Sequence, residues 1–333
     1  MVSMGETTSA EQKALFRFSI PDHSVSAYDR SLFAPPANKE VREEKLSLHD
    51  FRTSEDITHG GTGIDTQGFT YIKRRSALSD SGRWFQEDDL ERIYFPEVEK
   101  LLCELTGAKR AVVNNVAFRR KVASKEDVDH SFVMKRGCDF DLAIAKSPKD
   151  VAVVYGKVED QSLEPSHLAH IDYSLQGLRD SVRYCRKDIC AAAVEALKAE
   201  DEGVENVPRY AAFSVWRPVK PVKRDPLAVC DWRTLDKSEF QGTVYRALSD
   251  VTPDGEYMLE ANAVLPSKKP EQQRWYWMPE QKEDDVLIIK LADTAAEKDP
   301  SIAGGCPHLS PIIPSTEDEE ARCSVECRVF AFW

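Results

Sequence analysis

The sequence lacks a long apolar run and the motifs of several common enzyme classes. No stretch approaches the roughly 18 apolar residues of a membrane-spanning helix, and residues 1–16 lack the basic start and apolar core of a secretory signal. The loop Gly60-Gly61-Thr62-Gly63 is not followed by Lys and Ser or Thr, so it is not expected to bind phosphate. No Gly-x-Ser-x-Gly motif is present, and a serine hydrolase therefore has no support. We expect a cytoplasmic protein with no membrane segment.

Clustered cysteines and an excess of positive charge are also missing. The eight cysteines include no Cys-x-x-Cys pair, so we expect reduced thiols and no cysteine-based zinc site. The formal net charge is −12, whereas nucleic-acid binding depends on Lys and Arg side chains that neutralise phosphates. We interpret the short basic runs at 119–121 and 220–224 as solvated surface. Nucleic acid is not an expected partner.

The chain has the pattern of one domain with an extension at its N-terminus. Residues 1–65 are polar and contain turn-forming stretches, so we expect an N-terminal extension that packs over the core without forming one. Residues 66–333 carry the hydrophobic patterns of a single domain. Apolar residues recur at helical spacing over 87–105, just before Gly107, and again over 175–197. This spacing predicts two helices.

Short runs rich in β-branched and aromatic residues fill much of the remaining chain. They predict strands at 110–118, 151–155, 209–216, 227–232, 257–264, 273–278, 286–291 and 324–333. Residues 119–150 are charged and irregular, and we expect them to form an inserted loop. Many short strands with a few early helices predict an α+β fold. Its core is expected to be a double-stranded β-helix (a jelly roll, cupin-like) with flanking helices.

His170-Ile171-Asp172 is the only His-x-Asp sequence in the chain. On an extended strand residues i and i+2 point to the same face, so the imidazole and the carboxylate could bind one metal ion. His308 lies far downstream, and a double-stranded β-helix brings a late histidine beside an early ligand pair. Two histidines and one carboxylate leave coordination positions open at iron for substrate and oxygen. The sequence therefore predicts an iron(II) site formed by His170, Asp172 and His308.

Arginines near the C-terminus are candidates for binding a carboxylate beside this metal. Arg322 begins an Arg-x-Ser sequence fourteen residues after His308, and the forked guanidinium of Arg binds carboxylates bidentately. Arg322 and Ser324 share a strand face and suit the distal carboxylate of 2-oxoglutarate. Arg328 is in phase with Arg322 and is the alternative clamp. Arg217, in Trp-Arg-Pro, is interpreted either as a structural ion-pair partner or as a residue that holds a carboxylate of substrate or cosubstrate.

Five segments taken together resemble one known family. They are His-Ile-Asp-Tyr-Ser at 170–174, Phe-Ser-Val-Trp-Arg-Pro at 213–218, Pro-Leu-Ala-Val-Cys-Asp at 226–231, Cys-Pro-His at 306–308 and Arg-Cys-Ser-Val-Glu-Cys-Arg at 322–328. These segments resemble the fungal hydroxylase/desaturase family, which includes gibberellin-desaturase-like and cephalosporin-methoxylase-related proteins. The resemblance covers roughly residues 65–333. The family tail usually reads Arg-Glu-Ser and then Ile-Glu-Val-Arg, so Cys323 and Cys327 depart from it without replacing a candidate ligand.

The resemblance implies an oxygenase that depends on Fe(II), 2-oxoglutarate and O2. It implies His170, Asp172 and His308 as iron ligands, with Arg322 and Ser324 at the cosubstrate. It also implies hydroxylation, desaturation or cyclisation of a small-molecule substrate, either a secondary metabolite or an amino-acid-derived compound. Two alternatives stay open at this point. One is a methyltransferase-like protein, although no glycine-rich loop follows a first strand; the other is a non-catalytic partner subunit, against which the complete ligand set argues.

Overall fold

Two β-sheets form the body of the protein in a computed structural model, which describes residues 12–32, 40–79, 83–86, 88–122, 151–158 and 162–333. The six-stranded sheet has the order β3 (Phe69–Lys73), β12 (Asp285–Asp293), β7 (Tyr210–Pro218), β14 (Ser324–Phe332), β4 (Arg110–Arg119) and β5 (Val153–Tyr155). The eight-stranded sheet has the order β1 (Gln12–Ile20), β2 (Glu40–Asp50), β11 (Trp275–Trp277), β8 (Ala228–Cys230), β13 (His308–Leu309), β6 (His170–Ile171), β10 (Glu256–Val264) and β9 (Phe240–Leu248). The predicted jelly-roll class with flanking helices is confirmed.

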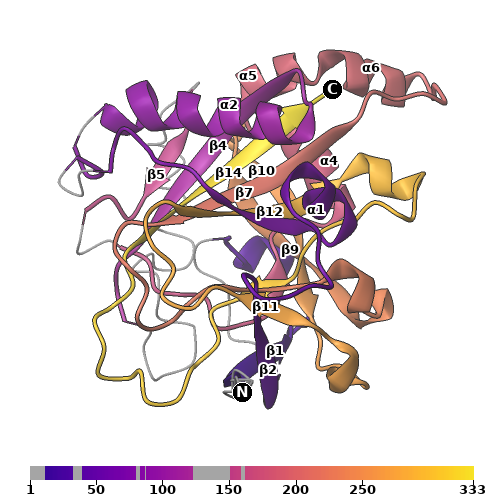
Figure 1. The fold of residues 1–333 in the computed structure, drawn as a ribbon. Coiled ribbons are helices and arrows are strands. Elements are labelled where there is room, and N and C mark those ends of the chain that lie inside the picture. The colour runs from indigo at the N-terminus through magenta and orange to yellow at the C-terminus, as the bar shows by residue number, and fades with distance from the viewer. Residues whose placement is uncertain (1–11, 33–39, 80–82, 87, 123–150, 159–161) are drawn as a thin grey trace, which may run out of the picture.

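Strand alternation gives the six-stranded sheet two different faces. On β14 the residues Val325, Cys327, Val329 and Ala331 pack outward with helix α2 (Phe95–Thr106), which lies across β4 and β14 in Figure 1. The alternate residues of β14 face the space between the sheets, where Phe330 joins the apolar core. Period-two alternation thus places polar and charged residues of the same strand on the inner face. This inner face carries the candidate site.

The N-terminal segment contributes more than the peripheral arm expected from its sequence. Strands β1 and β2 pair along their whole length, and β2 continues the sheet by pairing in parallel with β11. Phe16 and Phe18 are fully buried, and their rings lie 4.9 and 6.5 Å from that of Trp275. Five of the first six residues of β2 are charged, they lie on both faces of the strand, and four of them are exposed. These charged residues interrupt the alternating apolar pattern by which a strand is recognised in a sequence.

The two predicted helices form, and one of them is interrupted. The first consists of a π-helical turn at Leu90–Tyr94 and then α2, and it ends at Gly107 with φ 74°. The second is divided into α4 (Leu175–Tyr184), α5 (Lys187–Ala192) and α6 (Val194–Asp201). At the first break Arg186 has extended backbone, and its guanidinium binds Asp188 and the carbonyls of Val113 and Asn114. These tertiary hydrogen bonds outweigh the continuous helical pattern of the sequence.

Shorter helices connect the strands. They are α1 (Gly60–Thr66) and the 3-10 turns at Ala27–Asp29, Trp232–Thr234, Lys237–Glu239, Pro270–Gln272 and Thr294–Glu297. Within the described ranges, no helix combines the length and apolar character needed to cross a membrane. The seven cysteines in those ranges are free thiols. Most of the expected inserted loop, at 123–150, lies outside the described residues.

Candidate metal centre

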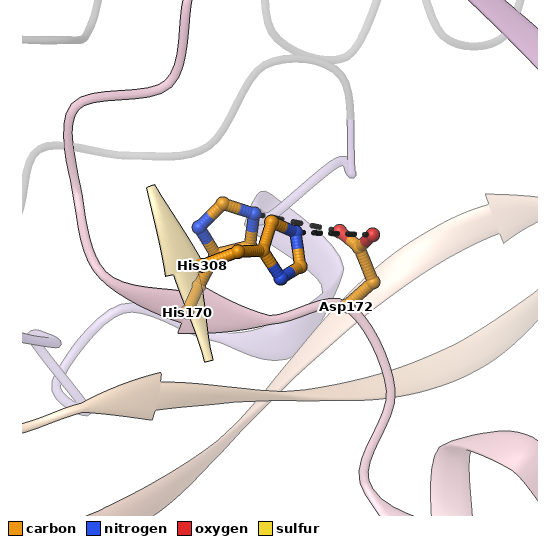
Figure 2. A group of neighbouring side chains, drawn as sticks. All are labelled: His170, Asp172 and His308. Carbon is orange, nitrogen blue, oxygen red and sulfur yellow. Dashed lines mark ion pairs between the residues drawn. The ribbon is translucent and has the colours of Figure 1, made fainter. Parts of the chain in front are cut away.

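His170, Asp172 and His308 meet on the inner face of the eight-stranded sheet. His170 lies on β6 and His308 on β13, and these two residues are direct partners in the antiparallel ladder between the strands. Asp172 follows β6 by one residue, so it projects on the same side as His170. Figure 2 shows both imidazoles directed toward the carboxylate. One ligand atom from each residue lies within 4.8 Å of the other two.

Backbone carbonyls set the orientation of both imidazole rings. Nδ1 of His170 lies 2.7 Å from the carbonyl of Leu168, and Nδ1 of His308 lies 3.1 Å from that of Cys306. A carbonyl oxygen can only accept, so each Nδ1 donates and each Nε2 keeps its lone pair. The Nε2 atoms lie 3.6 and 3.7 Å from the oxygens of Asp172. Carbonyls that accept from Nδ1 in this way fix the tautomer and the ring orientation of metal-binding histidines.

The local environment keeps Asp172 and His308 in the protonation states that a metal requires. Burial by itself would raise the pKa of Asp172, but Arg328 and then the two histidines outweigh it and hold that pKa well below its usual range. Burial, and next the neighbouring His170, lower the pKa of His308 to about 4. Asp172 is therefore ionised and His308 neutral at pH 7. Metal ligands must be deprotonated in this way before an ion can bind.

Arg328 contacts the metal-site carboxylate directly. Its Nε and Nη2 donate to the two oxygens of Asp172 at 3.1 and 2.9 Å, which is a bidentate ion pair. Its Nε also lies 3.5 Å from Glu326, whose carboxylate accepts a hydrogen bond from Ser214. The fork geometry of Arg fixes the plane of the carboxylate that it binds. Arg328 is thus already paired with Asp172 of the candidate site.

Arg322 lines a small cavity that also contains His170 and His308. It is 3% exposed, its Nη1 donates to the carbonyl of Asp225 and to Ser310, and its Nε has no partner. Burial, and then the charge of Arg119, lower the pKa of Arg322 to about 9. The hydroxyl of Ser324 is also buried without a partner. A buried guanidinium with a free Nε at this cavity suits a bound carboxylate.

The structure places further residues around this cavity that the sequence did not single out as part of the site. Arg119, Ser214, Trp216 and Glu326 all line it. The expectation that the basic run at 119–121 is solvated surface is wrong for Arg119, whose side chain is 18% exposed and lies 3.8 Å from Glu326. It is at the end of β4, where strand alternation turns it inward. Strand phase was the signal that could have identified it.

Arg217 lies away from the metal centre. Ser214 and Trp216 of β7 face the cavity with the histidines, whereas Val215 and Arg217 line a different cavity beside α2. The alternative that Arg217 binds a carboxylate in the same pocket as Arg322 therefore does not fit the structure. His167 is buried, and its Nδ1 contacts the carbonyl of Ser310 at 2.5 Å. It is a neighbour of the site outside the group of three potential ligands.

Comparisons with known proteins agree with this site. A protein-family model described as "Oxidoreductase/YMDC permease-like domain" matches residues 18–332. A gibberellin cluster GA4 desaturase from Gibberella fujikuroi is 30% identical, with 81% of this chain and 82% of the relative covered. Oxidoreductase chry3 from Gibberella zeae is 29% identical over 86% of this chain and 89% of the relative. Further relatives are named hydroxylase/desaturases and Fe(II)/2-oxoglutarate-dependent or alpha-ketoglutarate-dependent dioxygenases.

A solved structure shows the same fold. The iron and alpha-ketoglutarate-dependent endoperoxidase NvfI superposes with a TM-score of 0.64 at 21% identity, and the match covers 96% of this chain and 97% of the other. Both sheets of the jelly roll are therefore shared with a known oxygenase.

Proposed function

The chain belongs to the fungal hydroxylase/desaturase family of Fe(II)/2-oxoglutarate-dependent dioxygenases, and we propose that His170, Asp172 and His308 bind its iron. The observation that carries this proposal is the convergence of two Nε2 atoms and a carboxylate within 4.8 Å of one another. Two histidines and one carboxylate match the facial triad of non-haem iron oxygenases. The buried setting and the carbonyl-fixed tautomers support the same assignment.

Arg322 and Ser324 supply the second half of the proposed site. We assign to them the distal carboxylate of 2-oxoglutarate, because both side chains are buried and have unpartnered polar atoms, and Arg322 lines the cavity with His170 and His308. A carboxylate placed there would satisfy the free Nε of Arg322 and compensate a buried positive charge. Trp216 also lines this cavity, and its ring centroid lies 5.4 Å from the Arg322 guanidinium.

The protein contributes binding, orientation and charge to the reaction. Fe(II) together with 2-oxoglutarate supplies the O2-dependent oxidation of a substrate C–H bond, with the cosubstrate converted to succinate and carbon dioxide. Asp172 and the two histidines would hold the metal, and Arg328 keeps the carboxylate ionised and oriented. Arg322 fixes the far end of the cosubstrate. A cofactor enzyme of this kind contributes positioning and a shielded pocket, while the cofactor performs the difficult step.

The substrate is proposed to be a small fungal metabolite. The relatives named above include a desaturase, hydroxylase/desaturases and an endoperoxidase, so the same site supports more than one outcome. We propose hydroxylation, desaturation or ring closure of a small organic molecule. A screen of candidate metabolites for succinate release, followed by mass spectrometry of the products, tests this part of the proposal.

Anaerobic spectroscopy tests the metal assignment without knowledge of the substrate. Purified protein should bind one Fe(II) per chain and develop a weak metal-to-ligand absorption band on addition of 2-oxoglutarate. Asp172→Asn and His170→Ala should abolish the band, because each removes one of only three protein ligands. His23→Ala, which alters an exposed histidine, is the matched control and should retain the band. A full band in either triad variant would contradict the ligand assignment.

A further inference from the structure

A second cavity lies on the opposite side of the six-stranded sheet, between β7 and helix α2. Arg217 and Val215 line it from the sheet, and Lys100 lines it from the helix. The segment after β3 adds Arg74 and Arg75. Because neighbouring residues of β7 point to opposite faces, this cavity is separated from the metal centre by the sheet itself. It is therefore independent of the oxygenase site.

Arg217 is a buried cation without an anionic partner. Its side chain is 3% exposed, and no carboxylate in the described ranges forms an ion pair with it. Nη1 donates to the carbonyl of Glu283 at 3.0 Å, while Nε has no acceptor. The other neighbours are the rings of Trp84 and Tyr94, whose centroids lie 6.0 and 5.6 Å from the guanidinium. A buried charge normally has a counter-charge, so this arrangement is incomplete as it stands.

The acidic residues that line the cavity have other partners. Glu97 accepts hydrogen bonds from the hydroxyl of Ser76 and the amide of Ala77. Glu104 lies 2.7 Å from Arg74 and 3.8 Å from Lys100. Both carboxylates are thus used at the rim, where they hold the segment after β3 and the helix.

The remaining charges at the cavity are positive. Arg75 is exposed at the rim and has no ion-pair partner among the residues that the structure describes. The lining has the cations Arg74, Arg75, Lys100 and Arg217 and the anions Glu97 and Glu104, so it has an excess of positive charge. The buried hydroxyl of Tyr94 lies beside Arg217 and forms no hydrogen bond of normal geometry. Two guanidinium groups and a hydroxyl offer several donors and no acceptor charge.

We propose that this cavity binds a small oxyanion, with Arg217 as the buried anchor and Arg75 as the outer contact. A carboxylate or phosphate group carries the negative charge and the acceptor lone pairs that complement these donors. A guanidinium binds either group through parallel hydrogen bonds. Of the two interpretations of Arg217 drawn from the sequence, the first requires an ion pair, and none is formed among the residues that the structure describes. The proposed role resembles the second interpretation, in which Arg217 holds a carboxylate, but it is at this cavity and away from the iron.

Isothermal titration calorimetry of the full chain tests the proposal with two probes, inorganic phosphate and succinate, each at constant ionic strength in chloride buffer. The wild type should bind at least one of them, and the two titrations distinguish a phosphate from a carboxylate ligand. Arg217→Met should weaken that binding by about tenfold or more, as expected for the loss of a charge-assisted hydrogen-bond pair. Arg30→Met is the matched control, because it removes a buried arginine that lines neither of these two cavities. It should leave this affinity unchanged.

A second variant, Arg75→Gln, keeps the test valid if Arg217→Met disturbs the fold. Arg75 is exposed, so the substitution should preserve the fold and weaken anion binding by roughly two- to fivefold, the usual size of an exposed charge interaction. The proposal is overturned if neither anion binds the wild type, or if Arg322→Met abolishes binding while Arg217→Met and Arg75→Gln do not. The latter result would place the anion at the metal centre. A destabilised Arg217→Met with unchanged anion affinity would also overturn it, since Arg217 would then be purely structural.

Discussion

Replacing Arg328 tests how the protein prepares its metal-binding carboxylate. In Arg328→Met the two hydrogen bonds to Asp172, at 3.1 and 2.9 Å, are lost together with the adjacent positive charge. Two effects oppose each other. The carboxylate loses its fixed plane, which weakens metal binding. Removal of the cationic side chain also removes its repulsion of Fe(II), which strengthens metal binding. The prediction depends on which effect is larger.

The geometry favours loss of orientation as the larger effect. Glu326 lies 3.5 Å from Arg328 and offsets much of its charge, so the relief of repulsion is small. Each carboxylate oxygen has two lone pairs, so the arginine leaves one free for a metal. Loss of an outer-shell partner of a metal ligand typically lowers affinity about 10- to 100-fold. That corresponds to roughly 1.4–2.7 kcal/mol, about the net contribution of one hydrogen bond to a charged group.

Anaerobic titration with Fe(II), or with Co(II) as a spectroscopic substitute, measures this affinity without turnover. We expect Arg328→Met to raise the metal Kd by about 10- to 100-fold, and Arg328→Lys to recover part of the loss because it restores charge without the fork. The affinity for 2-oxoglutarate should be measured at saturating metal, where it should change little. If metal affinity is unchanged while 2-oxoglutarate binding is severely weakened, Arg328 is the cosubstrate clamp and our assignment of Arg322 is wrong.

Three further predictions follow from the same structure. Arg322→Lys should raise the Kd for 2-oxoglutarate by about 10- to 100-fold with the metal Kd unchanged; equal weakening of metal binding would argue against a clamp. For the metal-free protein, an unfolded histidine titrates near pH 6.5 and folded His308 near pH 4, so the unfolded state binds the extra proton between these values. Stability should fall with decreasing pH, by on the order of 2 kcal/mol between pH 7 and 5. Urea unfolding should show this dependence in the wild type and lose it in His308→Gln. Gly177→Ala should destabilise the fold by about 1–3 kcal/mol, because the added Cβ would lie 1.9 Å from the Glu260 carbonyl oxygen; an unchanged urea midpoint would contradict this contact.

Local patterns in the sequence anticipated the elements that carry the site. The assumption of extended backbone was enough to place His170 and Asp172 on one face, and strand β14, which begins two residues after Arg322 and contains Arg328, formed nearly where its β-branched residues indicated. The distant partner could not be derived from spacing. His308 reaches His170 only through the pairing of two short strands, β13 and β6, and strands of two residues have no periodicity to detect. That part of the prediction depended on the expected jelly-roll fold, on the position of His308 before Arg322 and on the family resemblance.

Other features were hidden because tertiary contacts determine them. Strand β2 is mostly charged over its first half. Its neighbour β1 is stabilised by contacts such as that between Phe16 and Trp275, which are far apart in the sequence. The helix expected over 175–197 is broken where Arg186 binds carbonyls of another strand. Hydrogen bonds of this kind cannot be read from helix propensity.

The distinction between Arg322 and Arg328 shows how one strand can organise two parts of a site. The two residues are in phase, so the sequence alone allows either to be the cosubstrate clamp. Four residues separate Ser324 from Arg328, which is about 13 Å of extended backbone, and Arg322 lies further still from the level of Asp172. Glu326 lies between them on the inner face and contacts both Arg119 and Arg328. We therefore assign one arginine to the metal ligand and the other to the far end of the cavity. Because the strand fixes this separation, the two arginines should not substitute for each other.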